Sequence, residues 1–162
     1  MKNNYFKIFS LPLDFAVDQE RLDDKYYQLI AASHPDSKTN SKLKPEDVNE
    51  GYKILQNDYS RLKHLLELTP GFQENANVLN PEFLMQFLQY QDELESGMLD
   101  ADEITALKKK MVKEKSQIMQ DVSDFRLVEK MDEASYEFAK LKFYVRIIEQ
   151  IEEIEDQDHE AI

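Results

Sequence analysis

The stretch His34-Pro35-Asp36 decides how the first part of this chain folds. Proline has a fixed φ and no amide hydrogen, and it disfavours helical backbone at the residue before it. The tripeptide follows a helical pattern of apolar and small residues: Leu22, Tyr26, Leu29, Ile30 and Ser33. It therefore predicts an outward-facing turn that ends a helix.

Apolar stripes on both sides of this turn predict an antiparallel hairpin of two helices, each about four turns long. Asp18 is a suitable N-cap for the first helix, and Pro45 suits the first turn of the second. His64 is predicted to lie on the helix surface. The second stripe is Val48, Tyr52, Leu55, Tyr59 and Leu62, and a short apolar group at Tyr5, Phe6, Ile8 and Phe9 is expected to close one side.

Three further helices are predicted after a polar connection that contains Pro70-Gly71. The first begins at Asn80-Pro81 and stops at Gly97, and the second runs from Asp100 to about Lys130. The third begins near Asp132, and its acidic end, residues 152–160, is expected to fray. Short links predict an antiparallel bundle. The chain is thus expected to be all-α, with domains at 1–68 and 81–162 and a linker at 69–80.

Apolar residues outside the core stripes leave two interpretations open. A face opposite the core stripe of the last helix carries Tyr136, Phe143, Ile147, Ile151 and Ile154, and the helix after Asn80 adds Leu84, Met85 and Leu88. Such residues indicate either a broader core or a partner surface. Periodicity alone favours packing within the protein.

Composition excludes several classes of function. The 162 residues carry a formal net charge of −13. Nucleic acid and anionic membranes are therefore not expected as partners. No apolar run approaches the roughly 20 residues that span a bilayer, and the polar start is unlike a signal peptide. We expect a cytoplasmic protein.

Metal, cofactor and catalytic sites are not expected either. The chain has no cysteine, and His34, His64 and His159 lack the spacing of metal ligands. His34 and Asp36 could be imagined as a base and its orienting acid. No nucleophile or oxyanion motif accompanies them, however, so an enzyme is not the favoured interpretation.

The first segment resembles a J-domain, the module by which co-chaperones stimulate the ATPase of DnaK-type chaperones. The resemblance rests on Tyr5-Phe6, on His34-Pro35-Asp36 and on the segment from Asn49 to Leu55. It implies that a chaperone is contacted by His34, Pro35, Asp36, Lys25 and Lys38. Two features depart from the family pattern: Ser37 replaces the usual lysine, and the preceding helix is acidic.

The whole chain is similar to the HscB (Jac-type) co-chaperones of iron-sulfur cluster assembly. The similarity lies at Arg61, Leu65-Leu66, Phe83-Leu84-Met85, Leu88, Asp92-Glu93-Leu94 and Lys140-Leu141-Lys142-Phe143. It implies delivery of the cluster scaffold IscU to an HscA- or DnaK-type chaperone. The residues implied to bind the scaffold are Leu84, Met85, Leu88, Asp92 and Phe143. Gln89 and Ser96 replace acids that are common in the family.

One alternative remains open at this point. The chain could be an ATP-independent helical adaptor that binds other proteins, with the tripeptide serving only as a loop.

Overall fold

The structure, a computed structural model, describes residues 3–38, 42–74 and 79–161. Within these ranges it contains seven helices and no strand, so the expected all-α class is confirmed. The chain divides into two compact units, residues 1–70 and 71–162. The predicted loop and linker include residues 39–41 and 75–78, which lie outside the described ranges.

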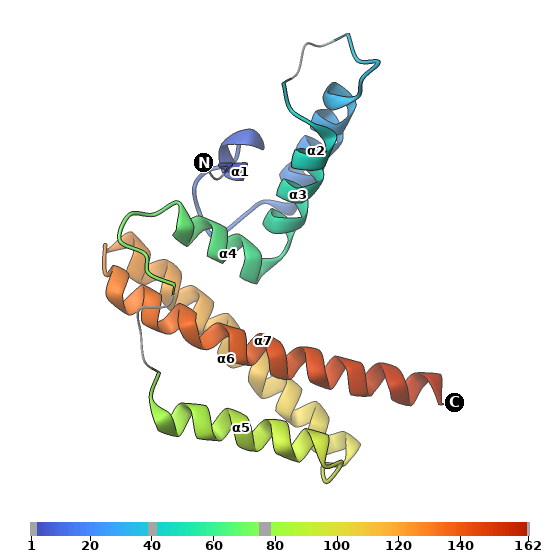
Figure 1. Cartoon of the computed structure of the whole chain (residues 1–162), viewed down its shortest axis with the longest axis vertical. Helices are drawn as coiled ribbons and strands as arrows, with labels where there is room; N and C mark the ends of the chain where they lie inside the picture. Colours follow the sequence, from blue (N-terminus) through green and yellow to red (C-terminus); the bar gives the residue numbers. More distant parts are fainter. Residues whose placement is uncertain (1–2, 39–41, 75–78, 162) are drawn as a thin grey trace. The chain divides into compact units, whose positions relative to one another are not determined.

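The first unit is built around a helical hairpin (Figure 1). Its helices are α1 (Tyr5–Ile8), α2 (Gln19–Ser33), α3 (Pro45–Gln56) and α4 (Asp58–Glu67). The Asp18 side chain accepts a hydrogen bond from the Arg21 amide, and Pro45 occupies the first turn of α3. Both predicted helix starts are confirmed.

The single second helix predicted from Pro45 onward is in fact two helices. The chain breaks at Asn57, whose φ of −92° and ψ of 127° are not helical. The Asn57 side chain accepts a hydrogen bond from the Ser60 amide at 2.9 Å and so caps α4. Asparagine is a strongly preferred N-cap, so it favours the start of a new helix here. The apolar stripe nevertheless continues from α3 into α4.

The core of the first unit gathers side chains from all four of its helices. Tyr5, Phe6 and Phe9 are buried, as predicted for the N-terminal apolar group. His64 is also buried, with 5 % of its surface exposed, so its predicted surface position is wrong. The aliphatic part of this core consists of Leu11, Leu22, Val48, Leu55, Leu62, Leu65 and Leu66.

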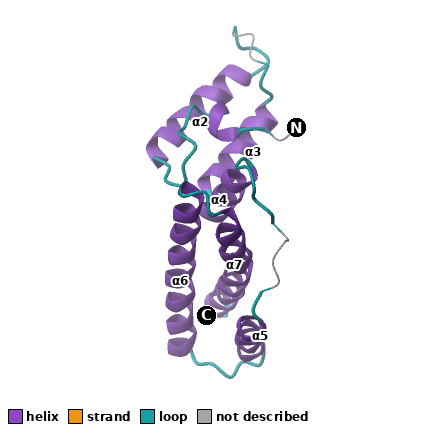
Figure 2. Ribbon diagram, turned by 90° about the vertical axis from the view of Figure 1, so that its left-hand side faces the viewer, coloured by secondary structure: helices purple, strands orange, loops and turns teal. Residues whose placement is uncertain are grey.

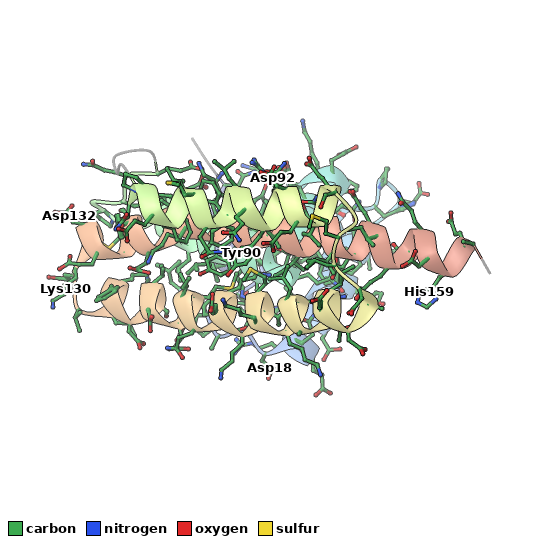
Figure 3. The ribbon with its side chains drawn as sticks, turned by 90° about the horizontal axis from the view of Figure 1, so that it is seen from below. Asp18, Tyr90, Asp92, Lys130, Asp132 and His159 are labelled. Atoms are coloured by element: carbon green, nitrogen blue, oxygen red, sulfur yellow. The ribbon has the colours of Figure 1, made fainter. Side chains whose placement is uncertain are left out.

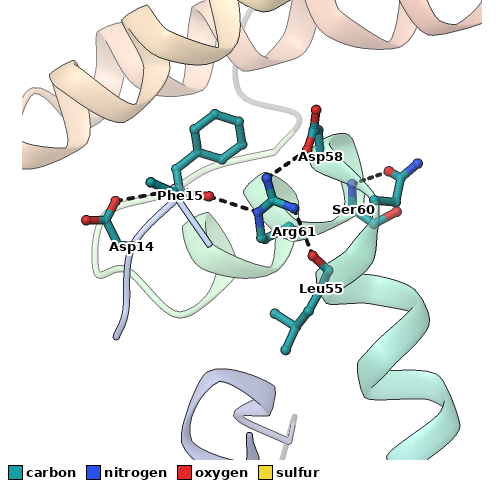
Figure 4. A network of polar contacts seen from close by, with 8 residues as sticks. Asp14, Phe15, Leu55, Asp58, Ser60 and Arg61 are labelled. Atoms are coloured by element: carbon teal, nitrogen blue, oxygen red, sulfur yellow. Dashed lines mark hydrogen bonds and ion pairs between the residues drawn. The ribbon is translucent and has the colours of Figure 1, made fainter. Parts of the chain in front are cut away.

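Arg61 ties the connection before α2 to the break between α3 and α4 (Figure 4). Its guanidinium donates to the carbonyl oxygens of Phe15 and Leu55, each at 2.8 Å, and to the Asp58 carboxylate at 2.7 Å. The group also lies 5.1 Å from the centroid of the Phe15 ring. Because the hydrogen bonds satisfy this buried cation, Arg61 stabilises the contact between the connection before α2 and the break between α3 and α4.

The second unit contains α5 (Pro81–Glu95), α6 (Ala101–Leu127) and α7 (Met131–Glu160). Asn80 caps α5 by accepting from the Glu82 amide, and Gly97 follows α5 with a φ of 66°. Asp100 and Glu103 form the expected capping box, with both hydrogen bonds at 2.9 Å. The expected fraying of residues 152–160 is not observed, because α7 continues to Glu160.

Helix α7 packs against both other helices of its unit. Figure 2 shows the described elements as helices and loops, and Figure 3 shows α5, α6 and α7 from another side. Since α7 has two neighbours, it buries two faces. Ile147 and Ile151, on the face opposite the predicted core stripe of this helix, are 3 % and 0 % exposed, so they belong to a broader core. Met85 and Leu88 on α5 remain 70 % and 60 % exposed.

Polar contacts between the helices add to this packing. Lys108 on α6 donates to Glu155 on α7 at 2.6 Å, and Lys110 donates to the Tyr90 hydroxyl on α5 at 2.9 Å. Tyr144 on α7 donates to Glu114 on α6 at 3.1 Å. Among the helices described, none is long and apolar enough to cross a membrane.

Candidate functional site

The turn at His34-Pro35-Asp36 is held by its own short hydrogen bonds. α2 ends at Ser33, and His34 adopts extended backbone with a φ of −65° and a ψ of 138°. The Ser37 amide donates to the His34 carbonyl oxygen at 2.9 Å, and the Asp36 amide donates to His34 Nδ1 at 3.2 Å. The side chains of His34 and Asp36 are 65 % and 92 % exposed.

This geometry fixes what the turn presents. Because Nδ1 of His34 accepts from an amide, the neutral imidazole carries its hydrogen on Nε2. The Asp36 carboxylate lies 3.6 Å from Nδ1, and its side chain is exposed to solvent. The turn thus offers a partner a donor and an acceptor that are positioned side by side.

The two lysines expected to share this surface are placed differently. Lys38 is exposed and follows directly after the turn. Lys25 precedes the last residue of α2 by roughly 12 Å along the axis, at about 1.5 Å per residue. It lines a shallow hollow together with Asp18, Glu20, Arg21, Asp24 and Gln28. The structure therefore does not bring Lys25 to the tripeptide.

Tyrosine contacts join α2 to α3 behind the turn. The rings of Tyr26 and Tyr52 stack with centroids 4.2 Å apart. Tyr26 donates to the Asn49 side chain at 2.9 Å, and Tyr52 donates to Asp23 at 3.0 Å. The bond to Asp23 is the largest cause of the raised pKa of Tyr52. One acid of the acidic helix is thus used inside the unit.

The segment from Asn49 to Tyr52 also holds the N-terminal apolar group. Glu50 accepts a hydrogen bond from the Tyr5 hydroxyl at 2.9 Å. A Cβ placed on Gly51 would meet the Tyr5 ring at 2.5 Å and the Phe9 ring at 2.9 Å. The absence of a side chain at Gly51 therefore lets α1 pack directly on α3, which sequence reasoning did not anticipate.

A groove between α5 and α7 forms the second candidate surface. It encloses about 210 Å³, and Phe87 and Ile147, which are 6 % and 3 % exposed, contribute buried side chains to its lining. Three of the five residues implied to bind the scaffold, Leu84, Leu88 and Phe143, line this groove. Gln91 and Arg146 complete the lining, and neither was singled out from the sequence.

The other two implied residues lie in an adjoining hollow on α5. Met85 and Asp92 line it, and Leu88 lines both hollows. Figure 3 shows Asp92 at the outer edge of α5, whereas Tyr90 points toward α6. The five residues therefore form one continuous surface, which we call the α5–α7 surface: Leu84, Met85, Leu88, Asp92 and Phe143.

Aromatic contacts fix the wall of the groove that α7 contributes. The Phe143 ring meets Phe83 edge-on at 5.7 Å between centroids and Phe87 at 5.9 Å. Phe87 also contacts Tyr144 at 4.7 Å. Burial and the nearby Glu114 raise the pKa of Tyr144 far above its ordinary value. The groove thus has an aromatic wall, which suits an apolar side chain from a partner.

No cluster of three or more metal-binding side chains was found among the described residues. In that part of the chain every buried side-chain nitrogen and oxygen has a hydrogen-bond partner. The two exposed surfaces, rather than a buried polar centre, are therefore the candidates for function.

Comparison with known proteins identifies the family. The sequence is 31% identical over 172 residues to the co-chaperone protein HscB homolog of Pseudoalteromonas atlantica, covering 94% of this chain and 97% of that protein. The chain belongs to the HscB co-chaperone family. The HscB homolog of Mannheimia succiniciproducens is 28% identical, with 96% and 97% covered. The family model of the HSCB C-terminal oligomerisation domain matches residues 79–152.

Solved HscB structures share the fold. The chaperone HscB from Vibrio cholerae matches with a TM-score of 0.78 and 26% identity, covering 96% of this chain and 99% of that chain. The human co-chaperone protein HscB matches with a TM-score of 0.75 at 21% identity, covering 95% and 83%. The resemblance inferred from sequence is therefore confirmed at the level of an HscB-type co-chaperone.

Proposed function

We propose that this HscB-type protein stimulates the ATPase of a DnaK- or HscA-type chaperone in the cytoplasm and delivers the iron-sulfur scaffold IscU to it. In this proposal residues 1–68 are the J-domain, 69–80 the linker and 81–162 the scaffold-binding domain. The protein itself needs no catalytic site or cofactor, because the chemistry takes place on the chaperone.

The observation that carries the first half of the proposal is the exposed turn at His34-Pro35-Asp36. Its donor and acceptor face solvent at the end of α2, where another protein can reach both. Such a contact changes the hydrolysis rate only if it favours one state of the chaperone over another. The proposed contact residues are His34, Pro35 and Asp36, with Lys38 beside them and Lys25 as a separate contact further along α2.

The α5–α7 surface supports the second half. Met85 and Leu88 are apolar, large and mostly exposed beside a groove with a buried apolar lining. Exposed apolar groups gathered in this way mark an interaction surface. With scaffold and chaperone held by one chain, the effective concentration of scaffold at the chaperone rises, so two modest affinities suffice.

The test measures chaperone ATP hydrolysis with and without this protein. We expect stimulation by the wild type and its loss in His34→Gln. The matched control is His159→Gln, which changes an exposed histidine near the end of α7. No stimulation by the wild type, or equal stimulation by His34→Gln, would favour the ATP-independent adaptor in which the turn is only a loop.

The scaffold contact is tested separately by isothermal titration with IscU. We propose Leu88 and Phe143 as central anchors of the contact. Leu88→Ala and Phe143→Ala should therefore each weaken binding at least tenfold, equal to about 1.4 kcal/mol, since truncating a hot-spot residue costs about 2 kcal/mol or more. Leu127→Ala serves as control, because Leu127 is 65 % exposed on α6. Unchanged affinity in the two groove variants would contradict the proposal that the α5–α7 surface binds the scaffold.

A further inference from the structure

Two basic side chains flank the groove without an acidic partner. Lys142 and Arg146 lie one helical turn apart on α7, both are exposed, and Arg146 lines the groove. Within the described residues neither forms an ion pair. Lys142 Nζ lies 5.3 Å from the centroid of the Phe143 ring. Like charges at this spacing slightly destabilise a helix, so helix stability does not account for the pair.

The charge of the surrounding unit makes this pair unusual. Residues 71–162 contain 22 acidic and ten basic residues, whereas residues 1–70 contain 11 and ten. Two other lysines of the second unit pair with acids. Lys140 lies 2.7 Å from Glu137, and Lys108 lies 2.6 Å from Glu155. Lys142 and Arg146 thus place two cations without an acidic partner at the edge of the apolar groove of a strongly acidic unit.

We propose that the groove binds two neighbouring groups on the scaffold: an apolar side chain and a carboxylate. The apolar side chain enters between Leu88 and Phe143, and the carboxylate is bound by Arg146 with Lys142 beside it. This inference rests on the proposed function and adds the chemistry of the bound scaffold segment. A guanidinium is suited to this task because its planar fork can donate two parallel hydrogen bonds to a carboxylate.

Charge argues against a second copy of this chain as the occupant. Each copy carries a formal net charge of −13, most of it in the unit that contains the groove. Such charge opposes self-association. An acidic side chain on a scaffold segment, by contrast, meets cations at the groove and finds an apolar pocket beside them.

Isothermal titration of IscU at low and high salt tests the cation. We expect Arg146→Gln to weaken binding about fivefold at low salt, equal to about 1 kcal/mol, and to reduce the salt dependence of the Kd. Lys142→Gln should have a smaller effect in the same direction. Arg146→Lys should recover part of the loss, because it keeps the charge but not the fork. Lys113→Gln, at an exposed lysine of α6, is the matched control.

A double-mutant cycle then identifies the carboxylate. Each exposed Asp or Glu of the scaffold is changed to its amide and titrated against wild type and Arg146→Gln. One scaffold variant should weaken binding to the wild type and have no further effect on Arg146→Gln, since both changes break the same contact. No scaffold acid that couples to Arg146 would overturn the inference.

The outcomes separate this inference from the proposed function. If Leu88→Ala weakens binding but Arg146→Gln leaves both affinity and salt dependence unchanged, the carboxylate contact is wrong and the scaffold surface stands. If no variant alters binding, or IscU does not bind, the proposed surface fails and the inference fails with it. Light scattering that shows a dimer lost in Arg146→Gln would assign the groove to a second copy and overturn the inference.

Discussion

The imidazole of His64 accepts a hydrogen bond from the backbone amide of Tyr5, with 3.1 Å between Nε2 and the amide nitrogen. The ring also stacks on Phe6, with centroids 5.7 Å apart and planes 6° from parallel. A histidine near the end of α4 therefore anchors the start of α1. The contact is buried, so its loss leaves an unsatisfied donor in the core.

His64→Leu is expected to lower the free energy of unfolding of the first unit by about 1–3 kcal/mol, the usual cost of an orphaned buried polar group. Chemical denaturation followed by circular dichroism measures it. His159→Leu is the control and should change little. Equal stability of His64→Leu and wild type would show that the Tyr5 amide finds another partner.

Gly51→Ala should also destabilise the first unit, although alanine is normally the better helix former. The propensity gain is about 1 kcal/mol, whereas overpacking a core typically costs about 1–3 kcal/mol. The second effect should win, because the added Cβ would lie 2.5 Å from the Tyr5 ring and 2.9 Å from the Phe9 ring.

Thermal unfolding of Gly51→Ala measures this balance. Gln56→Ala, at an exposed position of the same helix, controls for helix propensity. A higher Tm for Gly51→Ala than for wild type would contradict the packing argument.

Arg61→Lys should destabilise the first unit nearly as much as Arg61→Met. Lysine keeps the charge but cannot reach the carbonyl oxygens of Phe15 and Leu55 and the Asp58 carboxylate together. Loss of charge-assisted hydrogen bonds of this kind costs about 1.5–3 kcal/mol each at most, and neighbouring losses are not additive. Urea unfolding of both variants is the measurement, and full retention of stability in Arg61→Lys would show that charge alone suffices.

Alkaline pH should destabilise the second unit through Tyr144. Its pKa in the folded protein is raised because the hydroxyl is buried and lies near Glu114. Because this pKa is higher in the folded protein than in the unfolded chain, the Tyr144 hydroxyl contributes its full stabilisation below the pKa of unfolded tyrosine, about 10. This stabilisation is lost as the pH rises from about 10 toward the pKa of Tyr144 in the folded protein.

Tyr144→Phe should therefore flatten the fall in stability above about pH 10, where unfolded tyrosine begins to ionise. Lys108 and Lys110 have pKa values raised by their hydrogen bonds to Glu155 and Tyr90, so part of the fall will remain. Unfolding followed from pH 8 to 11 provides the comparison, with Tyr27→Phe as the exposed control. Identical profiles of stability against pH for Tyr144→Phe and wild type would show that ionisation of Tyr144 does not cause the fall in stability.

Local sequence rules predicted the helix starts well. The caps at Asp18, Asn80 and Asp100 and the stop at Gly97 depend on side chains within four residues of the helix end, so the information is local. The break at Asn57 was missed because the apolar stripe continues through it. Only the capping asparagine indicated it.

Non-local packing accounts for the other differences. His64 was expected at the surface because nothing near it in sequence indicates that the Tyr5 amide would meet it. Periodicity leaves Ile147 and Ile151 open to two interpretations, because it does not show that both α5 and α6 pack against α7. Arg146 was missed because an arginine on an exposed helix face is ordinary until the neighbouring groove is known.

The hydrogen bond from Tyr5 to His64 spans 59 positions in the chain, and the bond from Arg61 to Phe15 spans 46. Both close large loops, whose entropic cost is recovered only when both ends are present. During synthesis the turn at His34-Pro35-Asp36 leaves the ribosome before α4 does. The first unit therefore completes its fold only after α4 emerges, so the nascent chain exposes the turn before its supporting core exists.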